Sequence, residues 1–154
     1  MVQWHDGMSA PRRHRLRLAD ARMLSPSVRG LTFEAIGEAP QYRAGQSMDL
    51  LVPTQSGLVM RRPYSVASAP DPAGTRTLDF AVTRVEGGPT SKALHALAPG
   101  ALVQADGPNR GWLARRAGEE QTRTLFVATG SGLAPFRARL QEELARADGP
   151  RIAL

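Results

Sequence analysis

Residues Arg62 to Ser65 combine a fixed cation, a proline, an aromatic ring and a hydroxyl. The guanidinium of Arg62 can bind a phosphate in fork geometry, the ring of Tyr64 can lie against a planar ligand, and the hydroxyl of Ser65 can hydrogen-bond a ring heteroatom. In a strand, Arg62 and Tyr64 would point to one face and Ser65 to the other, unless Pro63 bends the chain. Taken alone, the motif is better explained as a purely structural barrel strand with a core tyrosine.

A second segment, residues 87–91 (GGPTS), stands before a helix that we predict from Ser91 to about residue 98. The first amides of a helix have no intrahelical partner and attract anions, which makes this turn a candidate phosphate site. Thr90 or Ser91 is also a good N-cap, so a capped helix after a tight turn explains the same residues. The candidate phosphate-binding residues are Gly88, Pro89, Thr90 and Ser91.

A third segment, residues 128–136 (ATGSGLAPF), joins an apolar run at 124–129 to a helix predicted from about Pro135. Gly130 and Gly132 would let a pyrophosphate approach the backbone closely. The third glycine of the dinucleotide-binding fingerprint is absent, and so is the Gly-Lys-Ser/Thr of a P-loop. An ordinary strand-to-helix turn therefore remains an alternative.

The elements that must position these motifs are short segments of alternating apolar residues, separated by glycine and proline. They predict six strands and hence an antiparallel barrel or sandwich. The chain then becomes polar at 114–123, a predicted linker, before the apolar run 124–129, which is typical of a strand in a parallel sheet. With the helix and a further strand at 151–154, this begins a βαβ unit. The six predicted strands are 15–18, 27–36, 47–53, 57–68, 77–85 and 101–108.

Composition limits the remaining classes. The 154-residue chain has no cysteine and three separated histidines, which argues against disulfides, iron–sulfur centres and a metal site. A net charge of +6 suits anionic partners, but the arginines lack a nucleic-acid-binding pattern. Without a long apolar run or a signal-peptide core, we expect no membrane span and a cytoplasmic protein.

In this order, RPYS, GGPTS and TGSGLAPF resemble the motifs of the ferredoxin-NADP reductase family. Residues 42–53 and 105–113 are similar to two further segments of that family's barrel, so the resemblance covers roughly residues 12–154. It implies a mainly β fold: an antiparallel Greek-key FAD-binding barrel at 12–113, the linker at 114–123, and an incomplete NAD(P)-binding α/β domain at 124–154.

The resemblance also implies roles for individual residues. Arg62, Tyr64 and Ser65 would hold the flavin phosphate, ring face and ring-nitrogen edge, and Tyr64 and Ser65 are our catalytic assignments. The diphosphate would lie at residues 88–91. The backbone of Ala81, Val82 and Thr83 would line the flavin's sugar-phosphate chain. The remaining cofactor-binding residues are Pro63 beside the ring and, for the nicotinamide cofactor, Thr129, Gly130, Ser131, Gly132 and Pro135.

The predicted activity is electron transfer from NAD(P)H through FAD, in preference to FMN, to a one-electron acceptor such as an acidic electron-carrier protein or an iron–sulfur partner. Hydride transfer to a flavin needs orientation rather than a protein nucleophile. The family's later strands lie beyond residue 154, so we expect a fragment that binds flavin, is reduced slowly by NAD(P)H, and self-associates through its incomplete C-terminal sheet. The alternative is a non-catalytic flavin-binding subunit or fragment that requires a partner.

Overall fold

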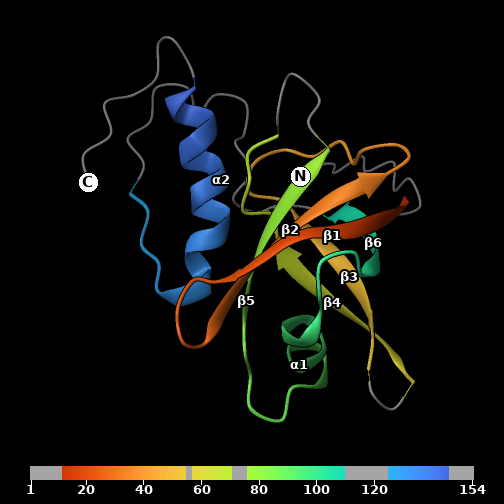
Figure 1. Ribbon diagram of the computed structural model, residues 1–154. Coiled ribbons are helices and arrows are strands. Elements are labelled where there is room, and N and C mark those ends of the chain that lie inside the picture. The colour runs from red at the N-terminus through yellow and green to blue at the C-terminus, as the bar shows by residue number, and fades with distance from the viewer. Residues whose placement is uncertain (1–11, 55–56, 71–75, 110–124, 146–154) are drawn as a thin grey trace, which may run out of the picture.

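The computed structural model describes residues 12–54, 57–70, 76–109 and 125–145 (Figure 1). Six strands and two helices make up most of these residues, with a short 3-10 turn before the second helix. In chain order the elements are β1 (Arg13–Met23), β2 (Val28–Ile36), β3 (Ser47–Pro53), β4 (Val59–Ser65), β5 (Thr77–Thr83), α1 (Pro89–Ala96), β6 (Leu102–Asn109), η1 (Gly130–Gly132) and α2 (Leu133–Leu144).

The strands form one antiparallel sheet in the order β4-β3-β6-β1-β2-β5. Strand β6 lies between β3 and β1, so the chain crosses over as in a Greek key. The outermost strands, β4 and β5, lie near each other. Just past the end of β4, the amide of Ala67 donates to the carbonyl of Asp79 in β5 at 2.8 Å. The sheet therefore curls toward a closed barrel, and the predicted six-stranded antiparallel fold is confirmed.

Alternate residues of the strands fill the interior of the barrel, as the period of two requires. Phe33 and Phe80 meet edge to face there, with ring centroids 6.0 Å apart. Leu94 of α1 is fully buried against this core. The largest fully buried side chains on the strands are Leu16, Leu18, Leu31, Phe33, Met48, Leu50, Val52, Leu78, Phe80 and Val82.

Helix α1 lies across one end of the barrel (Figure 1). It begins two residues before the predicted start, because Pro89 suits the first turn of a helix with its fixed φ and missing N–H. Two bonds anchor its last turn: Arg29 Nη1 donates to the carbonyl of His95, and Nε2 of His95 donates to the carbonyl of Val82 at 2.8 Å. The helix is thereby tied to both β2 and β5.

The predicted strand at 124–129 is wrong over its described residues, 125–129, which belong to no sheet. Leu125 and Val127 are 87% and 77% exposed. A strand of a parallel sheet needs neighbours for its backbone and cover on both faces, and the described residues supply neither. Helix α2 does form, from Leu133, and runs beside the barrel (Figure 1). The predicted linker 114–123 and strand 151–154 lie outside the described residues.

Candidate functional site

The motif at residues 62–65 lies at the end of β4, an outermost strand of the sheet. Arg62 is exposed, and its Nη1 donates to the carbonyl of Arg61 at 2.8 Å. Tyr64 is half-buried and packs against the core. Burial raises the pKa of the Tyr64 phenol above its ordinary value, while the charge of Arg62 works in the opposite direction. The tyrosine thus combines a structural contact with a protonated hydroxyl at neutral pH.

A cavity of about 610 Å³, which we name the ring cavity, lies between the ends of β4 and β5 and residues 127–136. Its volume falls within the usual range for ligand sites, roughly 300 to 1,000 Å³. It gathers ten of the sixteen predicted cofactor residues from three distant parts of the chain. These are Pro63, Tyr64, Ser65, Ala81, Thr83, Ser91, Thr129, Ser131, Gly132 and Pro135.

A second, larger cavity of about 1,060 Å³, the turn cavity, lies beside the start of α1. Gly88 and Pro89 line it, with the cations of Arg84 and Lys92 nearby and one carboxylate, Glu86, among them. Val85 lines both the ring cavity and the turn cavity. The N-terminus of α1 therefore lies between the ring cavity and the turn cavity, which share Val85 as a lining residue.

The turn before α1 has the properties of an anion site. A Cβ added to Gly88 would lie 2.9 Å from Ser91 Oγ and 3.1 Å from Val85 Cβ, so the turn has no room for a side chain there. Ser91 Oγ accepts from the amide of Val85 and donates to the carbonyl of Gly88, both at 3.1 Å. The buried hydroxyl of Thr90 has no hydrogen-bond partner among the described residues.

The segment after the barrel reaches the ring cavity through the turn at Gly130–Gly132. Gly130 has a φ of +55°, a conformation that glycine adopts without strain. Ser131 and Thr83 share a hydrogen bond of 2.7 Å between their hydroxyls, which joins this turn to β5. The two predicted half-sites, one for the flavin and one for the nicotinamide, are thus in direct contact.

Not every predicted residue lies at these cavities. Arg62, Val82 and Thr90 line neither the ring cavity nor the turn cavity. Val82 points into the barrel core, and its carbonyl is bound to His95. Gly130 lines a different hollow, between the barrel and α2.

Sequence reasoning missed the contacts that hold α2 against the barrel. Arg137 Nη1 donates to Asp79 Oδ2 at 3.0 Å and to the carbonyl of Ala67 at 2.9 Å. The amide of Ala69 donates to Gln141 Oε1 at 3.1 Å. No spacing rule links residues so far apart in the chain, and Asp79 sits at an ordinary outward position of β5. These bonds fix where the Gly130–Gly132 turn lies relative to the flavin motif.

Other kinds of site find no support in the part of the chain that the structure describes. It holds no group of three or more histidine, cysteine or acidic side chains that could bind a metal. Nor does it contain a helix with the length and apolar character needed to cross a bilayer.

Comparison with known proteins decides the family. The sequence model of the oxidoreductase FAD-binding domain matches residues 15–112, the whole of the barrel. The chain belongs to the oxidoreductase FAD-binding domain family. FAD is accordingly the cofactor of this barrel, and Gly88 and Pro89, which line the turn cavity at the start of α1, are the residues that would meet its diphosphate.

Three similar proteins place this FAD-binding domain in context. Ferredoxin–NADP reductase B of Sorangium cellulosum is 49% identical over 129 residues, which cover 83% of this chain and 51% of that protein. The reductase component DmpP of phenol 2-monooxygenase from Pseudomonas is 31% identical, over 85% and 35%. The structure of the Amycolatopsis cytochrome P450 reductase GcoB superposes with a TM-score of 0.75 at 28% identity, over 88% and 40%. The chain thus spans about half the length, or less, of these relatives.

Proposed function

We propose that this chain is the FAD-binding part of an oxidoreductase that moves electrons from NAD(P)H to a one-electron acceptor protein. One observation carries the proposal: the ring cavity is lined both by Tyr64 and Ser65 of β4 and by Thr129, Ser131 and Gly132 of the segment after the barrel. A donor and an acceptor ring that react by hydride transfer must lie face to face, and this cavity borders both motifs. The relative from Sorangium, named for ferredoxin and NADP, supports the same activity.

FAD, when bound, accepts a hydride and releases its electrons singly. The residues that would hold it are Tyr64 and Ser65 at the ring, Arg62 at a phosphate, and the turn at 88–91 at the diphosphate. The cations of Arg84 and Lys92 in the turn cavity would lie beyond the diphosphate, where the adenosine half of FAD belongs. FMN would leave that second cavity without a ligand, and this favours FAD.

The acceptor in this proposal is an acidic, ferredoxin-type electron carrier, which the chain's net charge of +6 suits. The domain division at 12–113, 114–123 and 124–154 is part of the same proposal, since the described barrel ends at Asn109 and α2 begins at Leu133. We also place the protein in the cytoplasm. Self-association through exposed Leu125 and Val127 is a further part of the proposal.

The test is anaerobic stopped-flow reduction of the FAD-loaded chain by NADPH and, separately, by NADH, followed by flavin absorbance. A matched variant is Gly132→Val. A Cβ at Gly132 would meet only Ala128 Cβ, at 3.9 Å, so the fold tolerates the side chain while the ring cavity loses space. We expect slower reduction by the nucleotide and unchanged reduction by dithionite. Bound flavin that neither nucleotide reduces would instead identify a flavin-binding module that needs a partner.

A further inference from the structure

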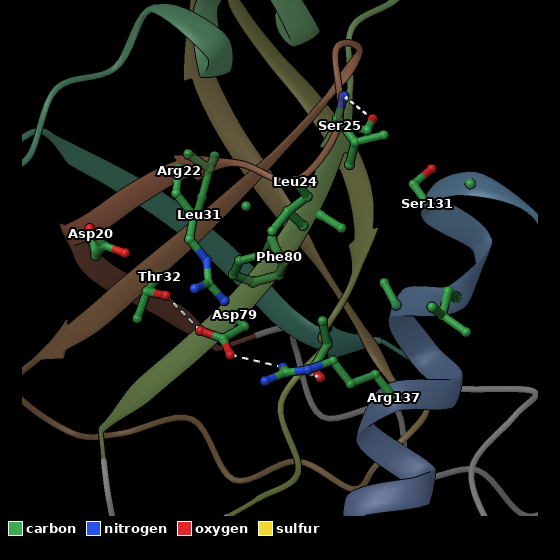
Figure 2. A pocket seen from close by; sticks show the side chains of 17 residues that line it. Asp20, Arg22, Leu24, Ser25, Leu31, Thr32, Asp79, Phe80, Ser131 and Arg137 are labelled. Carbon is green, nitrogen blue, oxygen red and sulfur yellow. Dashed lines mark hydrogen bonds and ion pairs between the residues drawn. The ribbon is translucent and has the colours of Figure 1, made fainter. Parts of the chain in front are cut away.

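A third hollow, the interface cavity, lies between α2 and the outer face of β2 and β5, with the end of β1 along its other side (Figure 2). Its volume is about 330 Å³, at the lower limit of the usual range for small-molecule sites. It shares part of its wall, including Ala81 and Ser131, with the ring cavity but opens on the other side of β5. Nothing in the electron-transfer proposal makes use of it.

The hollow exists because small residues face each other across it. Gly30 of β2 is paired with Ala81 of β5, and Gly130 and Ala134 lie on the opposite wall. Protein interiors are close-packed, so a helix that rests on a sheet normally fills this space with large side chains. A Cβ at Gly30 would lie 3.2 Å from the side chain of Leu24, which folds over the strand at this point. Glycine at position 30 therefore lets Leu24 pack against β2, while Ala81, Gly130 and Ala134 leave the hollow beside it.

The polar side chains at one end of the interface cavity already have hydrogen-bond partners. Asp79 accepts from Thr32 Oγ1 at 2.7 Å through one carboxylate oxygen and from Arg137 Nη1 at 3.0 Å through the other. Figure 2 shows these three side chains in a row at the lower end of the hollow. A ligand would consequently meet an ion pair and a hydrogen bond at this end of the hollow, rather than an isolated Asp79 carboxylate.

One cation faces the hollow without a bond of its own. Arg22 lies opposite Gly30 in the β1–β2 register, and Figure 2 shows its guanidinium extending between Thr32 and Phe80. No hydrogen bond or ion pair joins Arg22 to another described residue. Asp20, the other charged residue of β1 at this site, lies at the rim and forms no ion pair there either. Leu24 and Leu133 supply apolar walls.

We propose that the interface cavity binds a small, flat, apolar monoanion, of the class of aromatic carboxylates. The planar guanidinium of Arg22 matches a carboxylate in fork geometry, and the leucine walls would cover an apolar ring. The small residues Ala81, Gly130 and Ala134 leave the space that such a ring would occupy. The site depends on α2 as well as on the barrel, and it requires neither FAD nor NAD(P)H.

Benzoate is the probe, titrated into the FAD-loaded chain so that the ring cavity is filled, with amide chemical shifts recorded by NMR. Shifts at Gly30, Ala81 and Leu133, with none at Gly88, are the expected result. Benzamide has nearly the same shape without the charge, and we expect it to bind about tenfold more weakly, as the loss of one exposed charge-assisted hydrogen bond predicts. Equal affinity for benzoate and benzamide would overturn the proposal.

Two variants locate the binding. Arg22→Gln should weaken benzoate about tenfold and leave benzamide unchanged, because only the charged contact is lost. Gly30→Val should abolish binding of both, since the new side chain would displace Leu24, which lines the hollow, in a strand that favours valine. Arg15→Gln, an exposed arginine of the same strand outside the cavity, is the matched control and should change nothing. Undiminished benzoate affinity in both Arg22→Gln and Gly30→Val would also refute the site, whatever becomes of the flavin proposal.

Discussion

The barrel and the segment at residues 125–145 are held in place by different kinds of interaction. The barrel buries a continuous apolar core under six paired strands. The segment buries Ala134, Phe136 and Ala138 outside that core and leaves Leu125, Val127 and Leu133 at least half exposed. Polar bonds, chiefly Arg137 to Asp79 and Ser131 to Thr83, join it to the barrel. Burial contributes most of the stability of a fold, whereas partly exposed hydrogen bonds and ion pairs contribute little.

The proposed flavin contacts and nicotinamide contacts of the ring cavity therefore come from regions that are packed differently. The flavin contacts at β4 and at the turn before α1 belong to the strongly packed region. The contacts attributed to the nicotinamide belong to the weakly held one. Changes that loosen α2 should therefore alter reduction by NAD(P)H while flavin binding persists.

The largest expected effect comes from the barrel core. Phe33→Ala removes a ring with no exposed surface and should lower the free energy of unfolding by about 3 to 5 kcal/mol. Phe136→Ala removes a ring of α2 whose neighbour, Phe126, belongs to an exposed segment, and should cost less than about 2 kcal/mol. Chemical denaturation followed by circular dichroism compares the two. Equal losses would mean that both regions share one core.

The next effect concerns flavin binding by the packed region. Arg62→Ala should weaken FAD binding by about 1.5 to 3 kcal/mol, the usual contribution of a charge-assisted hydrogen bond. Fluorescence titration of the flavin measures the dissociation constant. Arg15→Ala, another exposed arginine, is the control. An affinity that stays the same in Arg62→Ala would remove this residue from the flavin site.

A smaller effect tests the attachment of α2. Asp79→Asn weakens the ion pair with Arg137, both side chains of which are partly exposed, and should cost about 0.2 to 1 kcal/mol locally. We expect faster amide hydrogen exchange in α2 and unchanged exchange in the barrel. Asp49→Asn weakens a comparable ion pair with Arg61, which joins β3 to β4 within the barrel sheet. This change should leave α2 unaffected. Faster exchange in α2 with both variants would argue against a specific attachment.

The smallest effect is a pH dependence confined to the barrel. Arg13 binds Asp106 through Nε and Nη2 at 2.8 and 3.0 Å, and these hydrogen bonds hold the pKa of the Asp106 carboxyl below its ordinary value. Because the folded pKa is lowered, the stabilisation is present above the unfolded pKa, near 4, and is lost as the pH falls through the folded value.

Asp106→Asn should consequently be less stable than the natural chain at pH 7 by under about 1 kcal/mol, since Arg13 is exposed to water. The gap should close on acidification. Denaturation midpoints between pH 7 and pH 3 measure it, and a gap independent of pH would show that the carboxylate charge is not involved.

Local patterns predicted the strands well because every strand except β4 has buried residues on one face. The alternation of Leu16 and Leu18 in β1, and of Leu78 and Phe80 in β5, reflects that burial directly. The same reasoning failed at 125–129, since an apolar run indicates that a strand requires cover but not that cover is present.

The candidate site was predictable in its residue types and less so in its geometry. Glycines and hydroxyls before a helix indicate an anion site from local chemistry alone; Gly88 lines the turn cavity, and the anion site there stays a prediction. That β4 and β5 are the two ends of the sheet, and so face one cavity, depends on the strand order. Neither that order nor the bond between Asp79 and Arg137 follows from local periodicity, because both join residues distant in sequence.

The position of the ring cavity at the two outermost strands affects the tendency of the protein to aggregate. Unpaired strand edges recruit strands from other chains, and natural proteins cover them. Here Tyr64 of β4 and Thr83 of β5 border the same cavity. A flavin bound in this cavity would cover the free edges of both strands and prevent strands of other chains from pairing with them. We expect the fraction of this protein that aggregates to fall as the FAD concentration during synthesis rises. The cofactor then assists folding as well as electron transfer.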